Sequence, residues 1–253
     1  MFGTPGYATP AWNELVIYEL HIRTFLYSPD GYNGTDSFTS VITKLDYLRD
    51  LGINAVELMP LGEFTGDISA GYNPAYIFAI EDEYGGPDGF RRFVNEAHKR
   101  GIAVIVDVVY NHLGDSAGDM WQFDGWSQNG KGGIYFYNDW RSHTDWGETR
   151  FDYGRGEVRQ FLCDNALRWL EQRFADGLRW DSVGSIRNGR SIFRPYQNTL
   201  DTVRPPPPPT SYGPRHSPLD RECPYKRCDN TRADIGLKNG RWRHRPHVQS
   251  EYL

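Results

Sequence analysis

The chain has 253 residues, of which 38% are hydrophobic and 24% charged, and its formal net charge is −5. This composition is typical of a globular, water-soluble protein of one large domain or two smaller ones. It excludes a membrane-spanning helix, because no run of about 18 apolar residues occurs. We expect neither a membrane nor a nucleic acid as a partner.

Three cysteines, Cys163, Cys223 and Cys228, are too few for a disulfide scaffold in a chain of this length. No histidine has the spacing that a zinc site would need beside them. The N-terminal ten residues also lack the basic region and apolar core of a signal peptide. We therefore expect reduced thiols and a cytoplasmic location.

The predicted elements alternate between strand and helix. Residues 102–109 are apolar on both faces, which is typical of a parallel strand covered by helices on each side. Glycines at positions 52 and 101 stand where helix C-terminal glycines are expected. The predicted strands are 15–22, 53–59, 102–109 and 177–183, and the predicted helices are 36–51, 87–100 and 157–174.

This order predicts a parallel sheet with right-handed crossovers, either an open doubly wound sheet or a (β/α)8 TIM barrel. The first strand is not followed by the Gly-x-Gly-x-x-Gly pattern of a dinucleotide fold. Polar residues gather instead at strand ends, which favours part of a barrel with about four strands. Residues 113–150 show no clear period, so they are predicted to form a long loop or a small subdomain.

The composition changes abruptly near residue 184. Residues 1–183 contain 15 basic and 27 acidic residues, a net charge of −12, whereas 184–253 contain 13 and 6, a net charge of +7. Ten of the 16 prolines lie in the second part, including Pro205–Pro209. With so few large apolar residues, this part is predicted to be a tail without regular structure.

The tail has three interpretations. Its proline run could be a polyproline II ligand for an SH3-like groove, and its positive charge could attract acidic partners. It could also be translated out of frame after an insertion or deletion near codon 184. The sharp compositional change in the middle of a patterned domain favours the frame error.

Polar residues follow the last two predicted strands. Asp107, Asn111 and His112 stand at the end of one, and Arg179 and Asp181 at the end of the next. Arg179 and Asp181 are two positions apart, so on a strand they point to the same side. A guanidinium beside a carboxylate keeps that carboxylate ionised, as a nucleophile requires. A buried structural salt bridge, a core carboxylate and a loop histidine remain alternatives for the individual residues.

Five segments between residues 12 and 183 resemble the catalytic barrel of the α-amylase family of glycoside hydrolases, above all its branching-enzyme and maltooligosyltrehalose-trehalohydrolase members. The segments are Tyr18-Glu-Leu-His-Ile-Arg-Thr-Phe25, Leu48-Arg-Asp-Leu-Gly-Ile-Asn-Ala-Val-Glu-Leu-Met-Pro60, Gly71-Tyr-Asn-Pro74, Asp107-Val-Val-Tyr-Asn-His112 and Gly177-Leu-Arg-Trp-Asp181. The resemblance implies an N-terminal half of that barrel over residues 1–183, acting on α-glucans such as starch, glycogen and maltooligosaccharides.

The resemblance also implies roles for individual residues. Asp181 matches the nucleophile, and Arg179 matches the partner that keeps it charged. Asp107 and His112 match residues that line the site of the reacting glucose, and Tyr72 matches the aromatic platform under that sugar. No cofactor is implied as a requirement. In many members calcium binds at the position of Asn111, although the branching-like members often lack the ion.

The resemblance leaves out one catalytic group. Retaining glycosidases use two carboxyl groups roughly 5 Å apart, a nucleophile and an acid/base. After Asp181 the sequence contains two glutamates, Glu222 and Glu251, and neither follows an apolar strand; no later histidine precedes an aspartate. We therefore expect a truncated, inactive or nearly inactive form of a hydrolase or transglycosylase. The alternative is a non-enzymatic glucan-binding or regulatory protein built on a half barrel. Linkage specificity, the choice between hydrolysis and transfer, and oligomeric state stay open.

Overall fold

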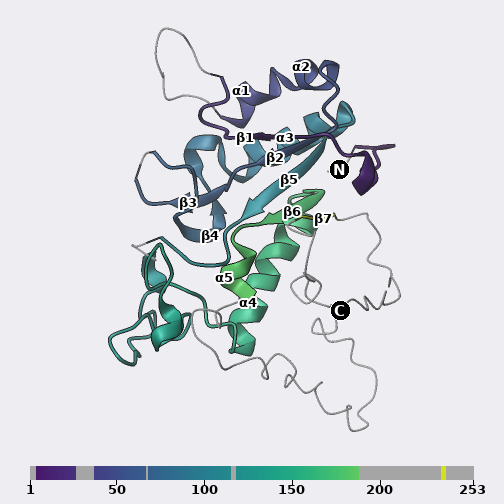
Figure 1. Ribbon diagram of the computed structural model, residues 1–253. Helices are drawn as coiled ribbons and strands as arrows, with labels where there is room; N and C mark the ends of the chain where they lie inside the picture. Colours follow the sequence, from purple (N-terminus) through teal and green to yellow (C-terminus); the bar gives the residue numbers. More distant parts are fainter. Residues whose placement is uncertain (1–3, 27–36, 67, 115–117, 188–234, 238–253) are drawn as a thin grey trace, which may run out of the picture.

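The computed structural model describes residues 4–26, 37–66, 68–114, 118–187 and 235–237 (Figure 1). Its main sheet contains four parallel strands in chain order, and a fifth strand pairs antiparallel with the last of them. These strands are β1 (Ile17–Leu20), β2 (Ala55–Leu58), β5 (Ala103–Val108), β6 (Gly177–Trp180) and β7 (Ile235–Leu237). The prediction of a parallel sheet of four strands is confirmed.

Helices connect these strands. They are α1 (Phe38–Ile42), α2 (Leu45–Asp50), α3 (Gly86–Lys99), α4 (Gly156–Leu167) with a π-helical extension (Arg168–Gln172), and α5 (Val183–Arg187). A short 3-10 helix, Trp12–Glu14, precedes β1, and another, Asp82–Tyr84, precedes α3. Because β1, β2, β5 and β6 are parallel, their carboxyl ends lie together at one edge of the sheet, as in a barrel.

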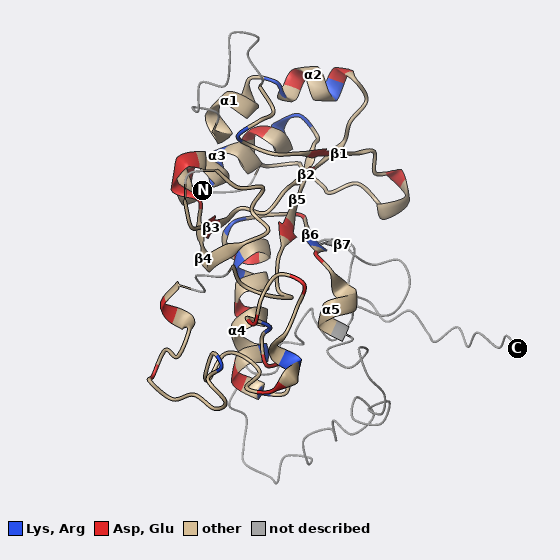
Figure 2. Ribbon diagram, turned by 60° about the vertical axis from the view of Figure 1, so that its left-hand side comes forward, with Lys and Arg blue, Asp and Glu red and all other residues tan. Residues whose placement is uncertain are grey.

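The helix predicted over 36–51 is two helices. Ser37 and Ser40 form a capping box at the start of α1. The Thr43 hydroxyl then donates to the Ser40 carbonyl oxygen at 2.6 Å, where a backbone amide would continue the helix. The chain restarts at Leu45, and α2 displays charges of both signs at its surface, including the Arg49–Asp46 pair (Figure 2).

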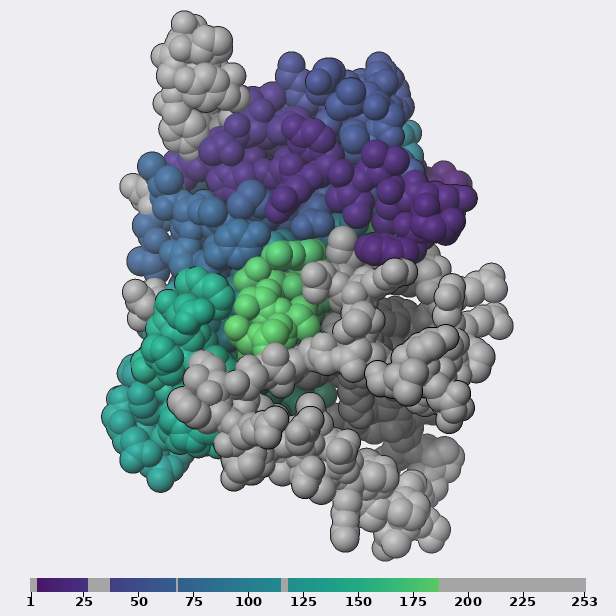
Figure 3. Space-filling view, in the orientation of Figure 1, coloured from purple at the N-terminus to yellow at the C-terminus, as the bar shows by residue number. Residues whose placement is uncertain are grey.

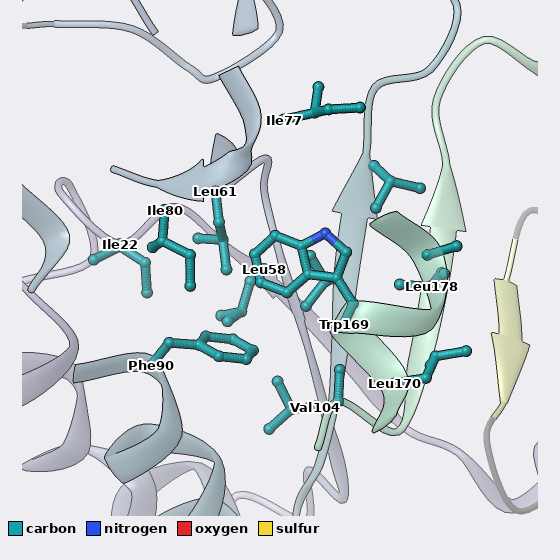
Figure 4. Close-up of a cluster of buried hydrophobic side chains, with 14 of the residues drawn as sticks. Ile22, Leu58, Leu61, Ile77, Ile80, Phe90, Val104, Trp169, Leu170 and Leu178 are labelled. Carbon is teal, nitrogen blue, oxygen red and sulfur yellow. The ribbon is translucent and has the colours of Figure 1, made fainter. Parts of the chain in front are cut away.

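The core lies between the sheet and its helices. Trp169 packs edge-on against Phe90 of α3, with ring centroids 5.3 Å apart. Figure 4 shows the Trp169 indole among apolar side chains from β2, β5, β6 and the helices. The apolar stripe on α3 is buried as its spacing predicts, and Gly101, with φ +75°, follows its end.

An antiparallel hairpin, β3 (Gly62–Phe64) and β4 (Pro74–Ile80), inserts between β2 and α3. The sequence analysis did not predict it. Two register shifts interrupt the pairing, so its residues do not alternate cleanly between buried and exposed. The hairpin matters to the site because the connection between its strands contains Tyr72.

Residues 118–153 form an irregular segment with two 3-10 helices, Gly118–Met120 and Trp140–Ser142. Isolated bridges join Phe136 to Phe151 and Thr144 to Gly147. The Phe136 and Phe151 rings stack at 5.6 Å, so the segment has a small aromatic core of its own.

Two expectations are wrong. The tail is not entirely without regular structure, because Ile235–Leu237 pairs with β6; an unpaired strand edge readily accepts another strand. Apart from this strand and residues 184–187 of α5, the tail prediction falls outside the described residues. Cys163 is disulfide-bonded rather than reduced. Disulfide pairing depends on which cysteine side chains the fold brings together, and cysteine spacing alone does not determine that.

Among the described residues, no helix is long and apolar enough to cross a membrane.

Candidate active site

Asp107 and Arg179 lie opposite each other at the carboxyl ends of β5 and β6. Arg179 Nη1 donates to Asp107 Oδ2 at 2.7 Å and to Asp181 Oδ1 at 2.8 Å. Burial disfavours the charged guanidinium, but the facing carboxylates outweigh burial and hold the pKa of Arg179 above its usual value. The register of these two strands thus allows the carboxylates of Asp107 and Asp181 to accept hydrogen bonds from the same guanidinium nitrogen.

Asp107 is the most enclosed member of this group, because its side chain is fully buried. The Tyr72 hydroxyl donates to Oδ2 at 2.8 Å, and Oδ1 has no hydrogen-bond partner within the described part of the chain. Burial raises the pKa of Asp107 to about 7, even though Arg179 and Tyr72 act in the opposite direction. Burial and the Asp107 charge together raise the pKa of the Tyr72 hydroxyl.

Asp181 is more open than Asp107, with 17% of its side chain exposed. Its Oδ2 accepts from Asn111 Nδ2 at 3.0 Å, while Oδ1 accepts from Arg179. Each oxygen therefore has a donor that fixes its direction. The Asn111 Oδ1 lies 2.8 Å from His112 Nδ1, so the amide links the histidine to the carboxylate.

One connected network therefore joins all six residues singled out in the sequence: Tyr72, Asp107, Asn111, His112, Arg179 and Asp181. They lie on β5 and β6, in the residues that directly follow these two strands, and in the β3–β4 connection. In Figure 3 the green atoms of α5, which follows Asp181, lie at the surface beside the teal atoms of residues 118–153.

The position of Tyr72 depends on the glycine before it. Gly71 has φ +89°, and a Cβ there would lie 2.4 Å from the Pro60 carbonyl oxygen. Only glycine allows this approach without a shift of the backbone. The β3–β4 connection is thereby held against the end of β2, with the Tyr72 hydroxyl within reach of Asp107.

A second set of contacts, missed from the sequence, fixes the same connection. His21 Nε2 lies 3.1 Å from the Ser69 carbonyl oxygen, and Gly71 N donates to Ser69 Oγ at 2.9 Å. The Ser69 hydroxyl also bonds the Asn73 side chain. Burial lowers the pKa of His21. His21 lies within one of the quoted motifs, but only the fold brings it to residue 69.

Trp146 is the other site neighbour that sequence reasoning missed. Its indole stacks on the His112 ring, with centroids 4.9 Å apart and planes inclined by 21°. His112 is 2% exposed, whereas Trp146 is 46% exposed. The aromatic composition of residues 113–150 was a signal, but their lack of period hid which side chain reaches the site.

The surroundings of Asn111 do not fit a calcium ion in the part of the chain that the structure describes. Its amide oxygen lies against His112, and its nitrogen donates to Asp181. No group of three or more His, Cys, Asp or Glu side chains suited to a metal occurs among the described residues. The site offers instead one partly exposed carboxylate, oriented by an arginine and an amide.

The chain is similar to one protein family and to several characterised proteins. The model of the alpha amylase catalytic domain matches residues 27–141. A malto-oligosyltrehalose trehalohydrolase of Saccharolobus solfataricus is 44% identical over 175 residues, which are 68% of this chain and 28% of that protein. The 1,4-alpha-glucan branching enzyme GlgB of Pseudoalteromonas atlantica is 39% identical over 175 residues, which are 67% of this chain and 23% of that enzyme.

A solved structure is similar as well. The crystal structure of a putative alpha amylase from Salmonella typhimurium superposes with a TM-score of 0.63 at 30% identity, covering 74% of this chain and 29% of that one. This chain therefore spans less than a third of the length of these relatives.

Proposed function

Because the matched part of this chain belongs to the α-amylase catalytic-domain family, we propose that the chain acts on α-glucans as a retaining glycoside hydrolase or transglycosylase. One observation carries the proposal. Asp181 stands at the carboxyl end of β6, partly exposed, with each oxygen held by a donor, Arg179 on one and Asn111 on the other. A nucleophilic carboxylate needs both this accessibility and this orientation.

In this proposal a carboxylate oxygen of Asp181 bonds to the anomeric carbon of a glucose unit while the glycosidic carbon–oxygen bond breaks. The departing sugar oxygen takes up a proton, from an acid group or from water, and a covalent glycosyl-enzyme remains. Arg179 donates to one oxygen of the Asp181 carboxylate, and Asn111 donates to the other. Asp107 is a positioning residue, because it binds the same guanidinium nitrogen from the neighbouring strand. Preorganised groups of this kind need not rearrange during the reaction.

Sugar contact is assigned to Tyr72 and His112. The Tyr72 hydroxyl donates a hydrogen bond to Asp107, and this contact fixes the orientation of the Tyr72 ring. His112 is fixed by Asn111 on one side and by the Trp146 stack on another. Rigid aromatic groups beside a few polar ones are typical of ligand sites. Starch, glycogen and maltooligosaccharides are the substrates that the family relationship favours.

We propose further that the 253-residue chain, tested alone, turns over slowly. Glu222 and Glu251, the glutamates that follow Asp181, fall outside the described residues, and neither follows an apolar strand in the sequence. Loss of general acid/base catalysis typically costs a factor of about 10² to 10⁴. The chain would then keep a nucleophile and a sugar site without efficient protonation of the leaving group.

Both proposals are tested with maltopentaose. Titration calorimetry of the purified chain should detect binding, and chromatography should show turnover below about 0.1 s⁻¹, a hundredfold under a typical enzyme rate. A chain that does not bind maltopentaose at millimolar concentration would refute the proposed function. Turnover near 10 s⁻¹ would refute only the slow-turnover proposal.

A further inference from the structure

His21 lies between a rigid part of the core and the connection that contains Tyr72. On the core side, the Tyr84 hydroxyl lies 2.9 Å from His21 Nε2, and the two rings meet edge-on with centroids 5.9 Å apart. Tyr84 is fully buried, and its ring packs edge-on against Phe38 and Phe64. The histidine therefore rests on a side chain that the surrounding close-packed core holds in place.

On its other side the imidazole holds the backbone of the β3–β4 connection. His21 Nε2 lies 3.1 Å from the Ser69 carbonyl oxygen. A carbonyl oxygen only accepts, so Nε2 carries the ring proton and donates it. Nδ1 is then the acceptor of a neutral ring, and the Thr24 hydroxyl lies 3.2 Å from it. Burial and the Arg23 charge lower the pKa of His21 against the opposing effect of the Ser69 carbonyl group, which favours this neutral form.

Ser69 transmits the restraint from His21 to Tyr72. The Ser69 hydroxyl accepts from Gly71 N at 2.9 Å and also bonds the Asn73 side chain. It therefore holds the residues on both sides of Tyr72, the residue assigned to sugar contact. One continuous set of hydrogen bonds thus joins the residue that follows β1 to the surroundings of the Tyr72 ring.

We propose that His21 is a positioning residue for glucan binding, which fixes the Tyr72 ring through Ser69 rather than by contact with the sugar. The proposal rests on the proposed function and adds a residue from outside the six-residue network. A ring that is already held in its bound orientation loses little conformational entropy on binding, whereas a released connection must be ordered by the ligand. Loss of the His21 contact should therefore weaken glucan binding through Tyr72.

The test is a double-mutant cycle in which calorimetry measures maltopentaose binding to the full 253-residue chain. His21→Ala should weaken binding about tenfold, equivalent to about 1.4 kcal/mol. In a Tyr72→Ala background the same substitution should change the affinity less than about twofold, because the ring that His21 positions is gone. His143→Ala removes an exposed histidine and is the control, which should bind maltopentaose like the parent chain.

Two conservative variants keep the test decisive if His21→Ala misfolds, which circular dichroism would show. Glutamine has an amide donor on a side chain long enough to reach the Ser69 carbonyl oxygen, whereas the asparagine side chain is one methylene shorter. His21→Gln should therefore retain most of the maltopentaose affinity, and His21→Asn should lose about tenfold.

The other outcomes overturn the inference. Unchanged maltopentaose binding in a folded His21→Ala chain would mean that Tyr72 needs no such support. An equal loss with and without the Tyr72 ring would assign His21 to the stability of the fold instead. Equal affinities of the glutamine and asparagine variants would exclude the Nε2 contact. If the unaltered chain bound no maltopentaose, the proposed function and this inference would fail together; each of the other results would overturn the inference alone.

Discussion

Asp107 is the residue whose burial has the clearest electrostatic consequence. It has no exposed side-chain surface, and its pKa is raised to about 7. The same group in an unfolded chain titrates near pH 4. Between these values the folded chain binds a proton that the unfolded chain has released, so the free energy of unfolding falls as pH rises from 4 to 7 and then levels off.

Replacing Asp107 by asparagine should remove this dependence. Asparagine has nearly the same shape and keeps an acceptor for Tyr72 and Arg179, but it has no proton to lose. Urea unfolding from pH 4.5 to 7.5 should show a fall on the order of 3 kcal/mol in the parent chain. The curve for Asp107→Asn should be flatter. Asp145→Asn, at an exposed position, is the control; parallel curves for all three proteins would contradict the assignment.

Gly71 and Gly66 form a natural pair for testing why the Tyr72 connection needs glycine. Both have φ +89°, but a Cβ at Gly71 would meet the Pro60 carbonyl oxygen, whereas nothing lies within 4 Å at Gly66. Gly66→Ala should cost only the left-handed backbone penalty, about 1 kcal/mol. Gly71→Ala should cost roughly 2–4 kcal/mol, because the clash with backbone adds to that penalty. Thermal unfolding measures both, and equal losses would show that the Pro60 contact is unimportant.

Among individual residues, the sequence predicted those at the strand ends because they lie in two short motifs. One motif contains Arg179 and Asp181, and the other contains Asp107, Asn111 and His112. Trp146, His21 and Ser69 were not predicted. Their contacts join segments far apart in the chain, and no local pattern of hydrophobicity or spacing records such proximity.

At the scale of elements, the β3–β4 hairpin is attached to α4 through buried polar groups. Asn165 Nδ2 donates to the Ile77 carbonyl oxygen at 2.8 Å, and its Oδ1 accepts from the Tyr110 hydroxyl. Asn165 is 1% exposed. One amide thus satisfies a β4 carbonyl group and a core hydroxyl, and it links the hairpin to the helix and to the end of β5.

Asn165→Ala should therefore destabilise the chain by about 2–4 kcal/mol, because it leaves a buried hydroxyl and a buried carbonyl without partners. Gln160 is an exposed amide on the same helix, bonded to Asp164, and Gln160→Ala should cost less than about 0.5 kcal/mol. Urea unfolding of both variants gives the comparison. Similar losses would mean that the amide bridge does not attach the hairpin.

The elements that the sequence predicted best are those with a simple period, such as the apolar strand β5 and the amphipathic helix α3. The helix over 36–51 was predicted as one element because its apolar stripe continues through Thr43, whose hydroxyl competes with the backbone. The hairpin was missed because its bulges remove the alternation that marks a strand.

For the whole molecule, the sheet among the described residues is open, with β1 at one edge. Unpaired edges of parallel sheets promote association between chains. We expect the isolated 253-residue chain to be marginally stable and to aggregate on heating, as light scattering would show. A reversible, cooperative thermal transition at high protein concentration would contradict this expectation.

The barrel class was predictable from strand order and polar strand ends, but β7 was not, because its pairing with β6 leaves no compositional signal in the tail.

The central claim is that Asp181 is a nucleophile in a glucan site, and α-maltosyl fluoride tests it most directly. In the expected reaction a carboxylate oxygen of Asp181 bonds to the anomeric carbon while the carbon–fluorine bond breaks, and fluoride leaves with the electron pair without needing a proton. The acid/base group is thereby bypassed. We predict fluoride release together with a maltosyl adduct on the peptide that contains Asp181, both lost in Asp181→Asn. A chain that binds maltopentaose but gives neither product would contradict the claim and favour a glucan-binding protein without catalysis.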